Sequence, residues 1–176
     1  MNKGMKILLL VTGISMFIGF MWNSLPFIKD NVHALFDPSA GALLNWNVNW
    51  GMVLISAVIV LGTTLIQKYT TDQNELRLIK KEQKLLQEEM KKFEKEPEKL
   101  LQLQKKQLEF IPKTMDITMR PLMYTIIPII LFFRWFSDYF VANPNLKIFG
   151  YLSWIWAYLI FSVVFSMIFR KVLNVA

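Results

Sequence analysis

The sequence contains no cysteine and a single histidine, His33. The first absence excludes disulfides, cysteine-ligated metals and thiol catalysis, and a lone histidine excludes the paired-histidine zinc motif of metalloproteases. No glycine-rich phosphate loop is present, and only Asp138 lies in or beside a long apolar run, whereas an intramembrane aspartyl protease needs two such aspartates. We therefore predict no enzyme, no catalytic residue, no bound cofactor and no metal site, with His33 an ordinary loop residue.

Apolar side chains are abundant and make up 54% of the 176 residues. They gather in four runs with almost no charge, at residues 7–22, 51–66, 122–140 and 148–169. A soluble core would alternate apolar with polar positions, whereas uncharged runs of this length are typical of membrane spans. The predicted fold class is an all-α integral membrane protein. The net charge of +7 indicates nucleic-acid binding only weakly, because the positive-inside rule accounts for much of it.

The first apolar run has two interpretations, a secretory signal peptide and a retained span. It follows Lys3 and Lys6 and would measure about 24 Å as a helix, which is short for a span. A cleavable signal needs small residues just after its apolar core, but residues 20–23 are Phe, Met, Trp and Asn. We therefore expect an N-terminal transmembrane segment over residues 1–23.

The remaining chain divides at its charges and prolines. We expect an extracytoplasmic loop over residues 24–49, broken by Pro26 and Pro38, and a first core transmembrane helix over 50–68. A cytoplasmic coiled-coil hairpin follows over 69–120 and ends in a methionine-rich segment that enters the next span. The second and third core transmembrane helices are expected over 121–141 and 148–171.

The segment from about residue 70 to 120 holds twelve Lys/Arg and ten Asp/Glu and is rich in helix formers. The Glu96-Pro97 step interrupts it, which favours two antiparallel helices. Apolar residues at helical spacing predict a coiled-coil seam formed by Ile79, Leu86, Met90, Phe93, Leu101, Leu108, Ile111 and Met115. The basic residues could contact the ribosome or anionic lipid, or could belong to a solvated, salt-bridged surface.

The distribution of Lys and Arg predicts the orientation. Lys3, Lys6, the hairpin, Arg170 and Lys171 fall on one side of a four-span chain. Lys29 and Lys147 fall in the opposite loops. By the positive-inside rule, we expect a multi-pass protein of the cell membrane with both termini and the hairpin in the cytoplasm.

Arg134 is the one basic residue well inside an apolar run, and an intramembrane charge is a candidate functional residue. It could serve as a structural anchor that reaches the interface with Asp138 one turn away. The alternative is a groove charge that meets polar groups of a client protein.

Polar residues recur at helical spacing in two of the spans. Ser56, Thr63 and Gln67 form one stripe, and Tyr158, Ser162 and Ser166 lie on another that continues to Arg170. Such residues can pack helices together in lipid. If the stripes face each other, they can instead line a water-accessible groove.

Met115, Met119 and Met123 recur every four residues just before the third apolar run. Flexible methionine side chains suit a surface that receives varied apolar partners, here the capture of clients at the cytoplasmic mouth. The alternative is that they continue the packing of the hairpin.

The order of these parts resembles archaeal YidC-like proteins of the YidC/Oxa/Alb insertase superfamily, whose relatives include EMC subunit 3, the TMCO family and the Get receptor subunit. The resemblance covers about residues 50–171. It rests on a span that ends QKYTTD at residues 67–72, a charged hairpin, the sequence MDITMRP at 115–121, the proline-containing span with Pro128, and a closing span.

The resemblance implies a three-span core with a groove open to cytosol and lipid. Bacterial members carry a groove arginine on the first core span, but residues 51–66 contain no basic residue and Lys68 is the nearest. The segment over residues 7–22 is also outside the three-span core.

We therefore expect a membrane protein insertase or chaperone that inserts short-tailed transmembrane segments through a partly polar groove. Its expected partners are nascent or tail-anchored membrane proteins and the lipid bilayer. Two further candidate partners are the ribosome, through the basic coiled coil, and an additional membrane subunit. Two alternatives remain: a coiled-coil scaffold or signalling protein that recruits a cytoplasmic partner, and a subunit of an ion channel or transporter.

Overall fold

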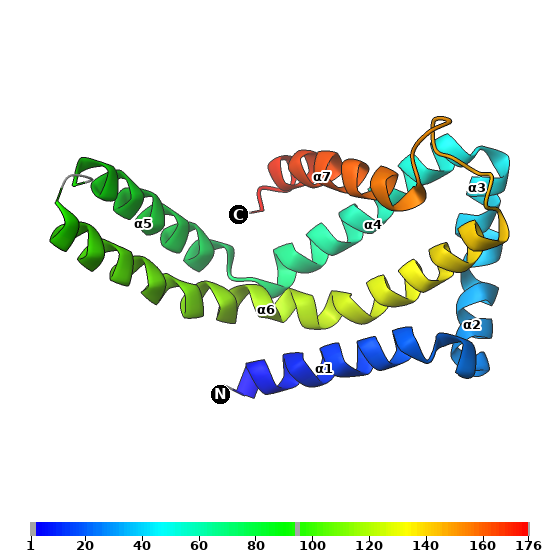
Figure 1. Ribbon diagram of the computed structural model, residues 1–176, viewed down its shortest axis with the longest axis horizontal. Coiled ribbons are helices and arrows are strands. Elements are labelled where there is room, and N and C mark those ends of the chain that lie inside the picture. Colours follow the sequence, from blue (N-terminus) through cyan, green and yellow to red (C-terminus); the bar gives the residue numbers. More distant parts are fainter. Residues whose placement is uncertain (1–2, 94–95, 176) are drawn as a thin grey trace.

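The structure is a computed structural model that describes residues 3–93 and 96–175. In these ranges the regular secondary structure is helical (Figure 1). In chain order the elements are α1 (Lys3–Phe20), η1 (Trp22–Ser24), α2 (Pro26–Phe36), the π-helical turn η2 (Asp37–Gly41), α3 (Ala42–Trp46), α4 (Val48–Thr70), α5 (Gln73–Lys92), α6 (Pro97–Ala142) and α7 (Trp154–Val172).

Within the described ranges, three helical segments are long and apolar enough to cross a membrane: α4, the Ile117–Ala142 part of α6, and α7. The apolar part of α1, Lys6–Phe20, is shorter. The prediction of an all-helical membrane protein is thereby confirmed, with three candidate spans and a shorter apolar helix where the first span was predicted.

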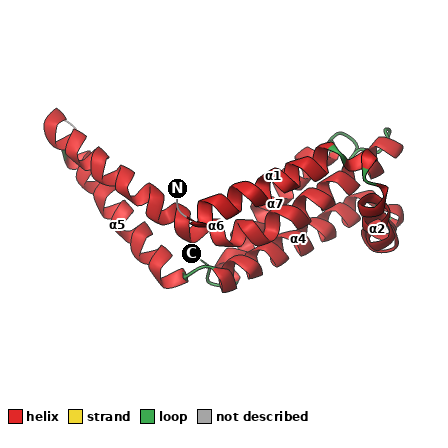
Figure 2. Ribbon diagram, turned by 90° about the horizontal axis from the view of Figure 1, so that it is seen from below, coloured by secondary structure: helices red, strands yellow, loops and turns green. Residues whose placement is uncertain are grey.

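The long helices are arranged as two pairs. Helix α1 runs beside α6, and α7 runs beside α4, with α4 and α6 between them (Figure 1). Gly19 of α1 faces α6, where an added Cβ would make an ordinary van der Waals contact with Ile130 Cγ2 at 3.8 Å. Helices α2 and α3 join the pairs at one end, and a hairpin of α5 with the first part of α6 projects from the other (Figure 2). Few contacts hold α4 directly against α6.

The core lies at the end that carries α2 and α3. Trp135 and Phe136 of α6 are fully buried there, together with Trp22 and Met52. Phe132 packs edge-on against Phe136 with ring centroids 4.6 Å apart. Large aromatic rings thus fix this end of the bundle.

Residues 24–49, predicted as a loop, are largely helical, so that prediction was wrong. Pro26 occupies the first turn of α2, where its missing N–H breaks no helical hydrogen bond. Pro38 lies in the first turn of η2, and the neighbouring Asp37 accepts a hydrogen bond from Trp135 Nε1 at 2.7 Å. The segment buries Ala40 and other apolar residues against α6, so tertiary packing stabilises it.

Helix α6 continues without a break through the predicted boundary at residues 120–121. Pro112, Pro121 and Pro128 lie inside it. Each proline removes one backbone hydrogen bond, but α5 packs along the first part of the helix and α1 along the rest. The helix therefore bends instead of ending (Figure 1).

Helices α5 and α6 lie side by side in the hairpin, and their contact uses a different register from the predicted seam. Leu76 and Ile79 of α5 pack with Ile117 and Phe110 of α6. Leu103 of α6 is also buried. The residues predicted for this arm of the seam are exposed, namely Leu101, Leu108, Ile111 and Met115. The prediction for that arm was wrong because α6 carries two apolar stripes, and only one of them faces α5.

Candidate functional site

Side-chain caps fix the starts of α4 and α5, and one loop fixes the start of α7. The Asn47 side chain accepts hydrogen bonds from the first amides of α4, and Asp72 does the same for α5. Before α7, Phe149 adopts a φ of 52° and donates its N–H to Asn49 Oδ1 at 2.6 Å. Gly150 follows with a φ of 82°. These contacts place α7 alongside α4.

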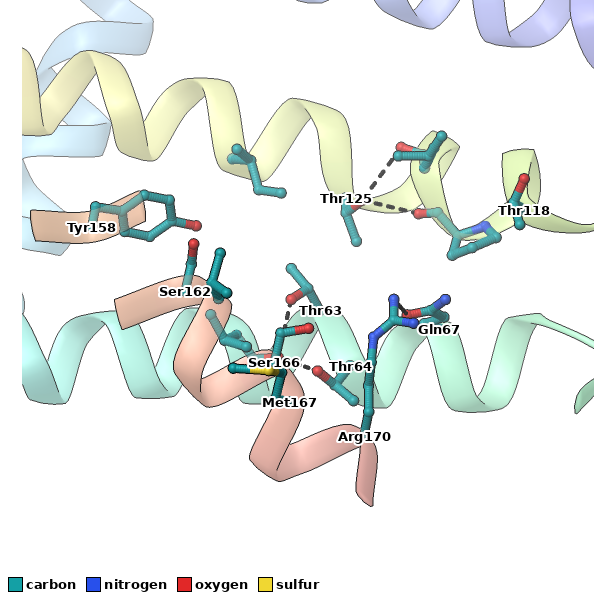
Figure 3. A pocket seen from close by; sticks show the side chains of 15 residues that line it. Thr63, Thr64, Gln67, Thr118, Thr125, Tyr158, Ser162, Ser166, Met167 and Arg170 are labelled. Carbon is teal, nitrogen blue, oxygen red and sulfur yellow. Dashed lines mark hydrogen bonds between the residues drawn. The ribbon is translucent and has the colours of Figure 1, made fainter. Parts of the chain in front are cut away.

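A hollow of about 660 Å³ lies between α4, α6 and α7, in the half of the bundle nearest the hairpin (Figure 3). Its volume would hold on the order of 20 water molecules. We call it the polar hollow because hydroxyl, amide and guanidinium groups from all three helices line it. The polar residues are Thr63, Thr64, Gln67, Thr118, Thr125, Tyr158, Ser162, Ser166 and Arg170.

The hydroxyl donors of this lining bond largely to backbone. Thr63, Thr125 and Ser162 each donate to a carbonyl three or four residues earlier, at 3.0, 3.1 and 2.9 Å. A hydroxyl also has two acceptor lone pairs, which remain available toward the hollow. The wall can therefore accept hydrogen bonds from water or from a polar group of a bound chain without exposing an unpaired donor to lipid.

A charge-assisted contact lies at the hairpin end of the polar hollow. Arg170 of α7 donates from Nη2 to Gln67 Oε1 of α4 at 2.8 Å, and the two side chains point toward each other (Figure 3). Close by, Arg77 of α5 donates to the backbone carbonyl and the side chain of Asn174 at 2.6 and 2.7 Å. These bonds hold the last turn of α7 against α4 and the hairpin and place a positive charge at the mouth.

A second hollow, of about 360 Å³, lies on the other side of the α4–α6 seam, beneath η2 and α3. We call it the apolar hollow, because aliphatic and aromatic residues such as Ile55, Val58 and Phe132 dominate its wall. Thr63, Thr125 and Ile129 line both hollows. The weakly packed seam therefore separates a polar space from an apolar one.

Most of the predicted groove residues line the polar hollow: Thr63, Gln67, Tyr158, Ser162 and Ser166. Sequence reasoning missed Thr64, Thr118, Thr125 and Arg170 as site residues. A signal was present for the last three, since Thr118 and Thr125 are two turns apart on one helix face and Arg170 lies one turn beyond Ser166.

Ser56, also predicted for the groove, does not line it. Its side chain is 0% exposed, and its Oγ has no hydrogen-bond partner among the described residues. It shares a face of α4 with Thr63, but the hollow begins only at Val60. Helix α7 packs closely along α4, and Ala157 of α7 is fully buried.

The three methionines predicted for the mouth do not line the polar hollow either. Met115 is exposed on the hairpin part of α6, and Met119 and Met123 are half-buried. At helical spacing, Met119 and Met123 share a face with Ile130, which contacts α1. The face of α6 toward the hollow carries Thr118 and Leu122 instead.

Arg134 lies away from the polar hollow, near the end that carries α2. Its guanidinium is 5.9 Å from the ring centre of Trp22, within the range of a cation–π contact. Asp138, predicted one turn away as its partner, accepts a hydrogen bond from Trp22 Nε1 at 2.7 Å and lies 3.2 Å from Lys29 Nζ. These contacts tie η1 and α2 to α6.

His33, predicted as a plain loop residue, lies in α2 between two carboxylates. Its Nδ1 is 3.2 Å from Asp37 Oδ1, and its Nε2 is 3.2 Å from Asp138 Oδ2. Within the described ranges, no group of three histidine, aspartate or glutamate side chains is placed to hold a metal ion. The cluster joins α2 to α6 by hydrogen bonds and ion pairs.

The comparison with protein families gives a match over residues 34–149 to the model described as "Integral membrane protein EMC3/TMCO1-like". No curated protein and no solved structure gives a significant match. The family match covers α4, the hairpin and the whole of α6, which carry two of the three walls of the polar hollow. It indicates a non-enzymatic role related to membrane protein insertion. The chain therefore belongs to the EMC3/TMCO1-like family of integral membrane proteins, relatives of the Oxa1/YidC/Alb3 superfamily.

Proposed function

We propose that this protein is a membrane insertase or chaperone that moves the short polar flank of a hydrophobic client segment through the polar hollow. The observation that carries the proposal is a polar cavity built from three apolar helices. Nonhelical or polar groups at membrane depth are tolerated only where protein or water satisfies them. A wall of satisfied hydroxyls beside Gln67 and Arg170 supplies that environment.

The polar hollow would lower the free energy needed to move the polar flank of the client out of water and through the membrane. An unpaired amide or hydroxyl transferred from water into hydrocarbon costs about 4–8 kcal/mol. In the polar hollow, the same group keeps hydrogen bonds to water and to the acceptor lone pairs of Thr63, Thr125 and Ser162. Arg170 would attract acidic flanking residues to the mouth. The task consumes no nucleotide and breaks no covalent bond.

The apolar hollow supplies the second half of this path. Its wall of aliphatic and aromatic side chains suits the hydrophobic part of the client. Because Thr63 and Thr125 border both hollows, separation of α4 from α6 would join them. The polar flank and the apolar segment of a client could then occupy adjoining spaces of matching polarity.

We propose further that the protein is an archaeal YidC-like member of the superfamily, an assignment that the order of its parts supports. The hairpin and both termini would face the cytoplasm, where most of the Lys and Arg residues lie. The polar hollow then opens toward the cytoplasm, the side from which clients arrive.

The test is insertion of a short-tailed model membrane protein into liposomes that contain the full chain. Ser162→Phe would fill the polar hollow, and we expect insertion to become roughly tenfold slower, since each 1.4 kcal/mol of added barrier gives a factor of ten. Val164→Phe is the control, because Val164 lies on the same helix but is exposed outside the hollow.

Equal insertion by wild-type liposomes and protein-free liposomes would refute the insertase. Insertion that is unchanged in Ser162→Phe would refute the polar hollow as the path. A photo-crosslinker at Thr63 should capture the client, whereas a scaffold acting through its hairpin predicts no such product. A channel subunit predicts ion conductance in the same liposomes.

A further inference from the structure

Arg134 is a charged group at membrane depth without a counter-ion. It lies in the Ile117–Ala142 span of α6, and its Nε is buried with no hydrogen-bond partner among the described residues. Its guanidinium stands 5.9 Å from the centre of the Trp22 ring and forms no ion pair in the part of the chain that the structure describes. An unpaired charge in a span is costly, so it marks a candidate site.

Asp138, the carboxylate one turn further along α6, is already engaged by other groups. Its Oδ2 accepts a hydrogen bond from Trp22 Nε1 at 2.7 Å and lies 3.2 Å from both Lys29 Nζ and His33 Nε2. Donors from η1 and α2 therefore share the carboxylate that could have neutralised Arg134. The guanidinium needs another anion.

The length of α1 indicates the depth of Arg134 in the membrane. Helices α1 and α6 run side by side from the hairpin end toward α2 (Figure 1), and Gly19 faces Ile130. The apolar part of α1, Lys6–Phe20, measures about 22 Å, which is less than the hydrocarbon core of about 30 Å. Arg134 lies about 6 Å beyond Ile130 along α6. With Lys6 at one boundary of the core, Arg134 is about 5 Å inside the opposite boundary.

The length of the α6 span gives a second measure of the same depth. Ile117–Ala142 has 26 residues, or about 39 Å of helix, and exceeds the hydrocarbon core by about 9 Å. If both ends share this excess, Arg134 lies about 7 Å inside the boundary. Over such a distance a long basic side chain can extend its charge to the interface. The anions that it meets there are the phosphate groups of lipids.

We propose that Arg134 binds the phosphate group of a membrane lipid in the leaflet on the side of α2. The planar guanidinium presents paired N–H donors that match two phosphate oxygens, and these charge-assisted hydrogen bonds supply the missing counter-ion. Arg134 lines neither the polar nor the apolar hollow, so the proposed path of a client does not pass it. The inference therefore stands apart from the proposed function.

The test is native mass spectrometry of the full chain in a neutral detergent, titrated with lipid. Phosphatidylglycerol supplies the phosphate, and a galactosyl diacylglycerol with the same acyl chains lacks it. We expect the wild type to bind one phosphatidylglycerol about tenfold more tightly than the galactolipid, because only the phosphate makes charge-assisted hydrogen bonds. Inorganic phosphate at millimolar concentration should not displace the lipid.

Two variants and a control locate the site. Arg134→Gln should bind both lipids equally, whereas Arg134→Lys should keep part of the preference because it keeps the charge and loses the fork. Lys147→Gln is the matched control, since Lys147 is an exposed basic residue on the same side and outside the span; it should bind as wild type does. Trp22→Phe keeps the guanidinium and should keep the preference for phosphatidylglycerol.

Equal affinity of the wild type for the two lipids would overturn the proposal, as would a preference for phosphatidylglycerol that survives in Arg134→Gln. If Arg134→Gln and Trp22→Phe lowered the unfolding temperature alike and left lipid binding unchanged, Arg134 would be a structural anchor only. Displacement of the lipid by inorganic phosphate would assign the site to a soluble anion. A photo-crosslinker at position 134 that captured a client and no lipid would assign the charge to the client; each of these results also overturns the lipid site.

Discussion

At the scale of single residues, the sharpest constraint is the contact between α3 and α4 at Gly51. A Cβ added there would lie 2.6 Å from the Leu43 carbonyl oxygen and 2.9 Å from the Leu44 nitrogen, so backbone would have to move. We expect Gly51→Ala to lower the free energy of unfolding by about 1–3 kcal/mol, the usual cost of overpacking. Circular dichroism of the purified chain, unfolded by heat or denaturant in one detergent, measures the change.

Gly62 provides the control in the same helix. A Cβ at Gly62 meets no heavy atom within 4 Å, so Gly62→Ala should leave stability unchanged or raise it by up to about 1 kcal/mol, because alanine is the better helix former. If the two variants were equally stable, the close approach of α3 to α4 would be wrong, and with it the position of the α3 wall of the apolar hollow.

Helical periodicity was enough to find much of the polar hollow from the sequence. Thr63 and Gln67 lie one turn apart, and Ser162 and Ser166 do the same on the facing helix, so a shared face could be read directly. Ser56 lies on the same face as Thr63 yet is sealed between helices. Periodicity identifies the face of a helix, but the distance to the neighbouring helix decides whether a cavity or a dry contact lies there.

At the scale of secondary-structure elements, α6 carries two apolar stripes along the hairpin, one buried and one exposed, and we expect only the buried one to stabilise the contact with α5. Leu103→Ala should destabilise the α5–α6 contact by about 2 kcal/mol, because Leu103 is buried and leaves a cavity. Leu108→Ala, on the exposed stripe, should change it by less than about 0.5 kcal/mol. Hydrogen exchange of the α5 amides reports the difference as faster opening in the first variant only. Equal exchange in both, or faster opening only in Leu108→Ala, would restore the predicted seam.

The helices of the hairpin could be predicted from composition and from Pro97, but not their register. Leu101, Leu108 and Met115 keep the same seven-residue spacing as Leu103, Phe110 and Ile117. The two series differ only in which of them meets Leu76 and Ile79 of α5. Without the partner helix in place, the sequence offers no physical ground for choosing between them. The same limit applies to residues 24–49, which fold as helices because α6 covers their apolar side.

At the scale of the whole molecule, two well-packed helix pairs enclose a weakly packed seam. Helix α1 covers the side of α6 away from the polar hollow, and α7 covers α4. The aromatic core around Trp135 and the hairpin connect the pairs at opposite ends. Since fewer contacts join α4 to α6 than join either helix to its own partner, the seam between them is the part of the bundle that can open at least cost.

The side of the membrane to which the polar hollow opens depends on the orientation of the whole chain. The segment from residue 70 to 120 carries twelve Lys/Arg, whereas the opposite connections carry Lys29 and Lys147. Basic residues near the ends of spans stay on the cytoplasmic side, and this segment is short enough for the rule to apply. Because the chain has no cysteine, Lys84→Cys and Asn145→Cys each give a single labelling site.

We expect a membrane-impermeant maleimide to label Asn145→Cys in intact cells and Lys84→Cys only after permeabilisation. Both positions are exposed, so burial cannot account for a difference between them. The opposite pattern would place the mouth formed by Gln67 and Arg170 outside the cell. A client made in the cytoplasm would then meet the aromatic core around Trp135 first, and the polar hollow could not receive its polar flank.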